Sequence, residues 1–172
     1  MRWLWYFMLY SALGFLLEIT FAHLIGHPKR DRKCFLLLPL CPVYGLGALL
    51  ILWFARPGYG PLWVFFAGGL AATAAELLMG LFYRYVVGVE FWDYSDLPGN
   101  LAGLVCPQFA AAWGALALIL VYRVHPVMDA MASAIPDAFG PPAAILLVCD
   151  ALVSSAALRE TGTTEVLKWY AP

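Results

Sequence analysis

Three acidic residues lie inside long apolar stretches, where a carboxyl group most needs a physical explanation. They are Glu18 in "GFLLE", Glu76 in "ATAAE" and Asp150 in "LVCDAL". An ionised carboxylate at the centre of a membrane helix costs roughly 2.5 to 3.5 kcal/mol on insertion scales. Such a group either joins helices by hydrogen bonds to Ser, Thr, Tyr or backbone, or binds a cation, a proton or a polar substrate. The residue types leave both interpretations open.

Small residues recur three or four positions from each acid. On a helix this spacing forms a face that packs closely against other helices. The three faces are Ser11, Gly14, Glu18 and Ala22; Gly69, Thr73, Glu76 and Gly80; and Asp150, Ser154 and Ala157. We therefore expect all three carboxyl groups to point into a helix bundle.

A Cys-Pro step with an aromatic residue two positions later occurs twice, in "LCPVYG" and "VCPQFA". Pro42 and Pro107 each remove a backbone donor, which fits either a kinked helix beside a cavity or an ordinary first turn. Cys41 and Cys106 could bind a soft metal or act as nucleophiles. However, no histidine accompanies them at depth, and buried cysteine usually packs as a small hydrophobe. We predict no metal site and no cofactor.

The segment "GVEFWDYSDLPGN" is both acidic and aromatic. Its oxygen atoms could bind a hard cation or contact a partner protein. The alternative is turn chemistry, with Asn100 capping the next helix and the aromatic rings lying in the headgroup belt. We interpret the segment as a gate or docking surface formed by Trp92, Asp93, Tyr94, Ser95, Asp96 and Asn100.

The elements that position these residues follow from the composition, which is 63% hydrophobic and only 12% charged. Such a balance excludes an ordinary soluble domain. A bilayer core needs about 20 mainly apolar residues per helix, and no stretch shows the alternation of a barrel strand. We predict one membrane domain, an all-α polytopic protein with about five transmembrane helices. The expected spans are 3–24, 35–55, 62–86, 101–123 and 141–158, with an interfacial segment at 126–140 and a tail at 159–172.

The order of helix with glutamate, connection, and helix opening with Cys-Pro occurs twice. This order predicts two related hairpins, 3–55 and 62–123, with a pseudo-symmetry axis along the membrane normal. Both glutamates and both Cys-Pro steps then fall in the same half of the membrane as the acidic segment. We infer a polar cavity, open to the cytoplasm and lined by Gly14, Glu18, Cys41, Tyr44, Glu76, Cys106 and Asp150.

The positions of the basic residues predict the orientation. Four of them crowd the first connection, which the positive-inside tendency places in the cytoplasm, with the N-terminus outside and the C-terminus cytoplasmic. They are Lys29, Arg30, Arg32 and Lys33. The first apolar run is long and contains Glu18, so it reads as a retained helix rather than a signal peptide. A net charge of −1 without a basic domain gives no indication of nucleic-acid binding.

Five segments in order resemble a known bacterial family: "GFLLE", "FLLLPLCPVYGLGA", "FWDYSDLPGN", "GLVC" and a late "HP". The similarity covers about residues 8–126 and is to the CmpB-like integral membrane proteins described as "putative ABC-transporter type IV". Family members commonly carry "GFLxGP" where this chain has "CFLLLP". The resemblance implies motif roles for Gly14, Glu18, Pro39, Cys41, Pro42, Tyr44, Gly45, Trp92, Asp93, Tyr94, Ser95, Pro98, Asn100, Gly103 and Cys106.

The resemblance also implies transport in a bacterial cytoplasmic membrane. The chain has no "GxxxxGK[ST]" phosphate loop, so a separate ATPase or other membrane subunit would supply energy. Homo-oligomers are compatible with the sequence. We favour a transport or permease-like subunit. One alternative is a membrane enzyme acting on lipid or a lipid-linked substrate, with Glu18 or Glu76 as base and Cys41, Cys106 or Ser95 as nucleophile. The other is a non-catalytic sensor or assembly subunit.

Overall fold

A computed structural model describes residues 1–24, 34–56 and 58–167, which form an all-α polytopic membrane fold, as predicted. Four of its helical segments are long and apolar enough to cross a membrane. The basic residues at 29–33, which carried the orientation prediction, lie outside the described residues. The α-helices are α1 (Arg2–Leu24), α2 (Pro42–Phe54), α3 (Pro61–Leu81), α4 (Pro107–Ile119), α5 (His125–Ala134) and α6 (Gly140–Thr161).

The predicted helix at 35–55 is wrong in its first third. Residues 34–41 have no regular structure, and Cys41 is the extended N-cap of α2 (φ −114°, ψ 92°) rather than a residue inside it. Two prolines explain this: Pro39 disfavours helical backbone at the residue before it, and Pro42 is pre-organised for the first helical position. The irregular segment is nevertheless buried, with the Cys34 side chain fully covered.

The predicted start of a helix at 101 is also wrong. Residues 101–105 form a tight turn closed by a bridge between Leu101 and Val105, with Gly103 in the left-handed region (φ 70°). Cys106 is extended (φ −149°, ψ 159°) and caps α4. The two Cys-Pro steps therefore have the same local role, each beginning a helix of 13 residues.

The expected helix end at 123 is absent. α4, a π-helical turn at Leu120–Val124 and α5 form one helical segment, Pro107–Ala134. Pro126 lacks an N–H, and a π-turn directly before it accommodates the missing bond. The predicted tail at 159–172 is also wrong for its described residues. α6 continues to Thr161, and the fully buried Leu167 packs with the core.

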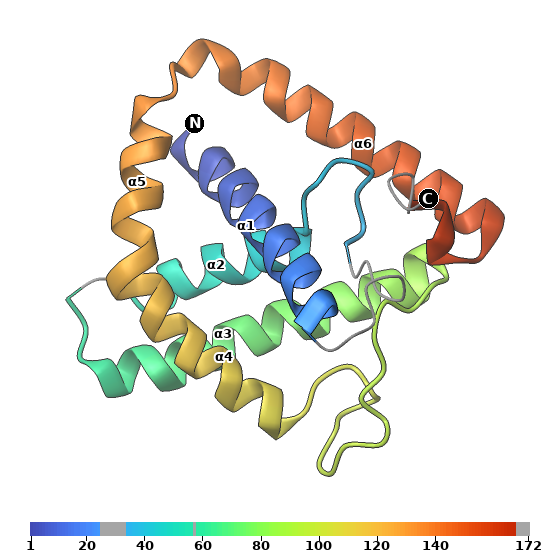
Figure 1. Cartoon of the computed structure of the whole chain (residues 1–172), viewed down its shortest axis with the longest axis horizontal. Coiled ribbons are helices and arrows are strands. Elements are labelled where there is room, and N and C mark those ends of the chain that lie inside the picture. Colours follow the sequence, from blue (N-terminus) through green and yellow to red (C-terminus); the bar gives the residue numbers. More distant parts are fainter. Residues whose placement is uncertain (25–33, 57, 168–172) are drawn as a thin grey trace.

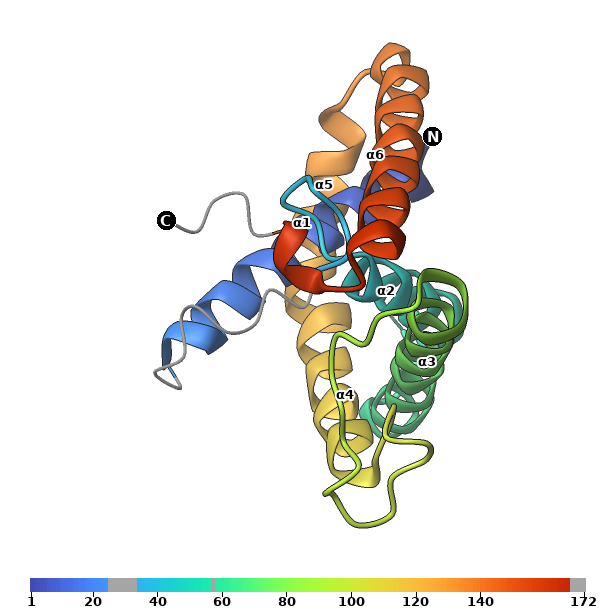
Figure 2. The same ribbon diagram turned by 90° about the vertical axis from the view of Figure 1, so that its right-hand side faces the viewer.

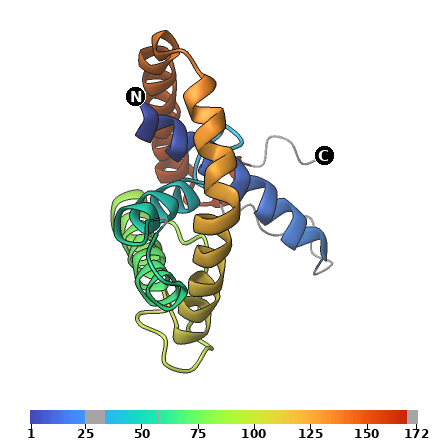
Figure 3. The same ribbon diagram turned by 90° about the vertical axis from the view of Figure 1, so that its left-hand side faces the viewer.

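The helices alternate in direction. In Figure 1, α1, α3 and α6 run from left to right, whereas α2 and α4 run from right to left, and the helices cross one another at large angles (Figure 2). α2 packs against both α1 and α3, and α3 packs along α4. α6 lies on the far side of α1 from α3 and α4 (Figures 2 and 3). The first four helices therefore form the main bundle, with α6 beside it.

Candidate functional site

Two adjoining cavities of about 380 and 270 Å³ lie among α1, α2, α3 and α4. The first extends toward Tyr10 and Val124, and the second toward Glu18 and Tyr94. Their shared lining is Leu17, Val43, Tyr44, Glu76, Trp113 and Leu116. We call the two cavities together the acidic groove. Its walls are mostly hydrocarbon and aromatic, so the cavity is less polar than the sequence suggested.

Glu76 reaches the groove from α3 and is only 4% exposed. Its Oε1 accepts a hydrogen bond from the Tyr94 hydroxyl at 3.0 Å, and its Oε2 accepts one from the Trp113 indole N–H at 3.0 Å. A close approach of α3 to α4 makes this possible, since a Cβ on Gly69 would lie 3.1 Å from the Gly114 Cα. The carboxyl group thus joins α3, α4 and the loop that precedes α4.

Glu18 reaches the groove from α1 and is partly buried. Its Oε1 accepts a hydrogen bond from the Tyr44 hydroxyl of α2 at 2.6 Å. Gly14, one turn earlier, lies directly against the Tyr44 ring, and a Cβ there would overlap the ring. The same ring meets Trp113 edge to face, with centroids 5.7 Å apart. A continuous row of side chains therefore links the two carboxyl groups.

The second Cys-Pro step has a phenylalanine where the first has Tyr44. Phe109 has no hydroxyl, but Tyr94 stacks on its ring with centroids 4.5 Å apart and supplies the hydroxyl that Glu76 accepts. Burial and the neighbouring Glu76 carboxyl raise the pKa of Tyr94, so its hydroxyl remains a donor. Each groove glutamate therefore receives a phenolic O–H beside a Cys-Pro step.

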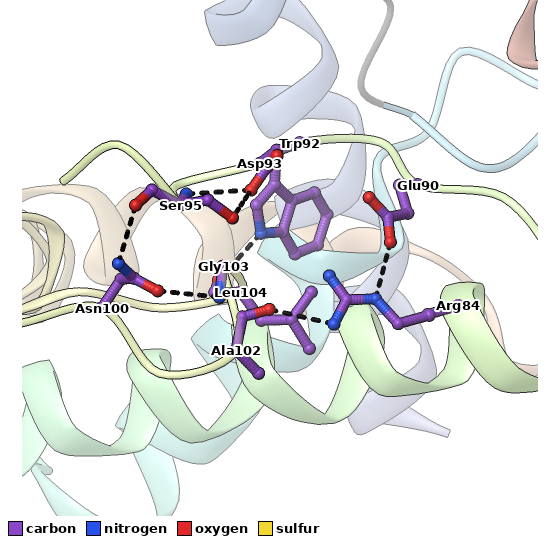
Figure 4. Close-up of polar contacts among 9 residues, drawn as sticks. All are labelled: Arg84, Glu90, Trp92, Asp93, Ser95, Asn100, Ala102, Gly103 and Leu104. Atoms are coloured by element: carbon purple, nitrogen blue, oxygen red, sulfur yellow. Dashed lines mark hydrogen bonds and ion pairs between the residues drawn. The ribbon is translucent and has the colours of Figure 1, made fainter.

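The acidic and aromatic segment at 88–100, called the acidic loop below, forms hydrogen bonds from its polar side chains to its own backbone (Figure 4). Asp93 Oδ1 accepts from the Ser95 N–H at 2.9 Å and from its hydroxyl at 2.6 Å, which lowers the pKa of Asp93. Asn100 donates to the Leu97 carbonyl at 2.8 Å and accepts from the Gly103 N–H at 3.0 Å. The alternative in which Asn100 caps the next helix is wrong, because α4 begins at residue 107.

Arg84 fastens this loop to the π-helical end of α3, Phe82–Val87 (Figure 4). Its Nη1 donates to the Ala102 carbonyl at 2.9 Å, and its Nε lies 2.7 Å from Glu90 Oε1. Within the loop, the Trp92 indole N–H donates to the Leu104 carbonyl at 2.8 Å. Trp92 also borders the groove, whereas Asp93, Ser95 and the exposed Asp96 are absent from its described lining.

Asp150 lies apart from the acidic groove. Its two oxygens accept from the backbone N–H groups of Leu37 and Leu38, at 3.1 and 2.9 Å. The Ser154 hydroxyl donates to the same carboxyl group at 3.0 Å. Asp150 therefore attaches α6 to the irregular segment 34–41. For this acid, the structure agrees with the interpretation that the carboxyl group joins elements by hydrogen bonds.

Cys41 and Cys106 are buried N-cap residues, and neither is in the described lining of the groove. None of the four cysteines forms a disulfide, and the described residues hold no cluster of three or more His, Cys, Asp or Glu side chains suited to a metal ion. The structure therefore brings Gly14, Glu18, Tyr44, Glu76, Trp92 and Tyr94 together at the groove. It leaves the two cysteines and Asp150 outside.

Sequence reasoning missed Trp113 and Phe109. An indole deep in an apolar helix is a signal for the first, because a buried N–H needs an acceptor. The aromatic residue two positions after each Cys-Pro step was a signal for the second. A further polar cluster on α1 and α5 was also missed: the Tyr6 hydroxyl donates to Asp129, and the Tyr10 hydroxyl lies 3.1 Å from His125 Nδ1.

Comparison with known proteins agrees with the motif resemblance. No curated protein and no solved structure matches the chain. One family model, described as "Putative ABC-transporter type IV", matches residues 5–156, which include both Cys-Pro steps, the acidic loop and the groove. The chain therefore belongs to this family of membrane proteins.

Proposed function

We propose that the protein is a transport or permease-like subunit whose cargo occupies the acidic groove. The observation that carries the proposal is that two glutamates from different helices border the same open space inside the bundle. A carboxyl group that only joined helices would be expected in packed protein, as Asp150 is. Glu18 and Glu76 each make a joining bond, yet both also border the cavity.

Among the described contacts, neutral phenol and indole groups donate to the two glutamates. Such donors solvate a carboxylate without adding a positive charge beside it. Because a carboxylate in a membrane is costly, a pair of them beside one cavity marks a pathway for a charged or polar ligand. We take the groove to open toward the cytoplasmic side, where we also place the acidic loop.

The buried irregular segment 34–41 supports the same proposal. Non-helical backbone at membrane depth is tolerated where protein buries it or where it borders a water-filled cavity. Interrupted helices of this kind form the binding sites of many transporters. Here the interruption leads directly into α2, whose first turn carries Tyr44 to the groove.

We further propose that the two hairpins are a parallel repeat. In both, a glutamate-bearing helix precedes an irregular segment, an extended cysteine and a helix opening with proline. The phenolic hydroxyl beside each Cys-Pro step also donates to the same kind of acceptor, the glutamate of the long helix that precedes it. This correspondence supports duplication beyond the short sequence echo.

The structure of the acidic loop favours a role as a docking surface over a role as a gate. Its internal bonds and the Arg84 contacts hold it in one conformation, and Asp93 and Asp96 remain exposed. We propose that a separate ATPase or another membrane subunit binds there.

Counterflow in proteoliposomes tests the transport proposal. A panel of labelled sugars, amino acids, inorganic ions, organic cations and organic anions would be compared with empty liposomes. We expect flux of at least one class, and its loss in both Glu18→Gln and Glu76→Gln, whose amides can still accept the tyrosine bonds. Glu160→Gln, an exposed change near the end of α6, is the matched control. Absence of flux for every class, or unchanged flux in both glutamine variants, would contradict the proposal.

A further inference from the structure

We infer, on the basis of the proposed function, that the groove binds a monovalent organic cation with an aromatic or alkyl body, which enters from the bilayer between α1 and α4. Three features of the groove carry this inference: the charge of its acids, the chemistry of its walls and the direction in which it opens.

The charge favours a cation. Glu18 and Glu76 present carboxyl oxygens to the groove, and Tyr44 and Trp113 present aromatic rings. The face of an aromatic ring is electron-rich and attracts organic cations, Trp most strongly. An anion would meet two acids and the negative faces of the rings, so the lining discriminates against it.

The walls favour an organic body over a bare metal ion. A hard inorganic cation needs about six oxygen ligands. Most of the groove is instead lined by hydrocarbon, contributed by Leu13, Leu17, Val43, Ile51, Leu116 and Ile119. The cavities of about 380 and 270 Å³ also lie near the size range of sites for drug-sized ligands, which are typically apolar with a few polar groups.

Besides its cytoplasmic end, the groove has a lateral opening between α1 and α4 that faces lipid. α1 contributes Leu17 and Phe21 to the rim, 44% and 55% exposed, and α4 contributes Leu116, 42% exposed. Both helices belong to segments long enough to span the bilayer, so their exposed apolar side chains face acyl chains. An amphiphilic cation dissolved in the bilayer can therefore reach the acids without crossing a water-filled entrance.

Equilibrium binding tests the inference separately from transport. The probes are tetraphenylphosphonium and tetraphenylborate, which have the same shape and opposite charge. Each would be titrated into the full-length protein in nanodiscs, with empty nanodiscs subtracted. We expect the phosphonium to bind and the borate not to bind. Glu18→Gln and Glu76→Gln should each weaken phosphonium binding about tenfold or more, which corresponds to about 1.4 kcal/mol.

Two variants at Trp113 test the aromatic contribution without removing an acid. Trp113→Phe keeps a ring face and should keep most of the affinity, whereas Trp113→Ala should lose it. Size-exclusion profiles and thermal unfolding would establish that each variant is folded. Glu160→Gln, an exposed change near the end of α6, is the control and should bind as the wild type does.

If lipid or a second protein chain fills the groove, the binding experiments should give different results. Equal binding of both probes, or phosphonium binding unchanged by both glutamine variants, would show simple partitioning into an apolar, lipid-filled groove and overturn the inference. Absence of binding, with a Leu116→Cys protein cross-linking to a second copy, would show that another chain covers the groove, and would also overturn it. If the phosphonium binds but no compound is transported, the inferred ligand class stands and the transport proposal is refuted. If another class of compound is transported and the phosphonium does not bind, the transport proposal stands and the inferred ligand class is refuted.

Discussion

Single glycines decide how closely α2 can approach α1. A Cβ on Gly45 would overlap the Ser11 hydroxyl and lie 2.7 Å from the backbone carbonyl of Phe7, which cannot move aside cheaply. A Cβ on Gly47, two residues later, would meet only the Ala75 Cβ at an ordinary 3.9 Å. We expect Gly45→Ala to destabilise the protein by about 1 to 3 kcal/mol. Gly47→Ala should be neutral or stabilising by up to about 1 kcal/mol, because alanine favours helix.

Thermal unfolding of both alanine variants in the same detergent checks this pair. The two sites share one helix and one substitution, so helix propensity cancels in the comparison. Equal melting temperatures for the two variants would mean that the α1–α2 contact is looser than the structure shows.

Asp93 and Ser95 should control the order of the acidic loop. Removing the Ser95 hydroxyl breaks the 2.6 Å bond to Asp93, and removing the Asp93 charge weakens both this bond and the 2.9 Å bond from the Ser95 N–H. We expect Ser95→Ala and Asp93→Asn to be cut faster by chymotrypsin after Tyr94 and Leu97 than the wild type is. Asp96→Asn in the same loop should be cut at the wild-type rate. Uniform cleavage rates across all three variants would refute this role.

The pH dependence of the loop follows from the lowered pKa of Asp93, whose ordinary value is 3.8. Because the folded pKa is depressed, the stabilisation is fully present above the ordinary value and is lost as the pH falls through the lower, folded one. Hydrogen-exchange protection of loop peptides, relative to a denatured control, should therefore stay constant from neutral to mildly acidic pH. A loss of protection within that range would contradict the assignment.

At the scale of elements, Asp150 connects α6 to the main bundle through segment 34–41. Asp150→Ala would remove the carboxyl oxygens that accept from the Leu37 and Leu38 N–H groups and would keep the Ser154 hydroxyl as an acceptor for Leu37, at a cost of about 1 to 3 kcal/mol. The irregular segment should then open and expose Cys34, which is fully buried. We expect faster maleimide labelling of Cys34 in a Cys149→Ser background, since Cys149 is exposed.

Ser155→Ala provides the control for this experiment. The Ser155 hydroxyl bonds only the Ala151 carbonyl of its own helix among the described contacts, at 2.7 Å. Its removal should leave the labelling rate of Cys34 unchanged. An Asp150→Ala protein that labels as slowly as the wild type would show that segment 34–41 is held in place without α6.

The sequence predicted the long helices well and the two Cys-Pro helices poorly. α1, α3 and α6 are uninterrupted apolar runs, for which length alone is informative. In front of α2 and α4 the apolar character continues into non-helical backbone, so hydropathy cannot locate the start. The helix starts could have been located from three prolines, Pro39, Pro42 and Pro107. Proline restricts the backbone of the residue before it and is found more often at the first position of a helix than inside one.

The candidate site was predictable in part for a similar reason. Glu18, Glu76 and the small residue Gly14 are unusual within an apolar span, so residue type alone drew attention to them. Trp113 and Phe109 are ordinary in a membrane helix, and their importance arises only from the contact of α4 with α3 and with the loop. Asp150 has the same residue-level signature as the two glutamates, and only tertiary contacts assign it a different position.

At the scale of the whole molecule, four helical segments are long enough to span the bilayer, whereas α2 has only 13 residues. That helix is about 20 Å long, short of a hydrocarbon core of about 30 Å. However, α1 and α3 both run from left to right in Figure 1, at a large angle to each other, and α2 runs back between them. Because two successive spans that cross in the same sense need a return between them, we propose that α2 with the preceding segment 34–41 is that return.

We therefore predict five crossings and termini on opposite sides, with the C-terminus cytoplasmic. A green fluorescent protein fused after residue 172 should fluoresce, and an alkaline phosphatase fused there should be inactive. A cysteine introduced at Gly58, in the turn between α2 and α3, should react with an impermeant maleimide added outside intact cells. The same position should be protected if α2 does not complete the return. Labelling at Gly58 only after permeabilisation, together with an active C-terminal phosphatase, would reverse the orientation. It would leave the groove geometry intact, because the groove depends on helix contacts and not on which side faces the cytoplasm.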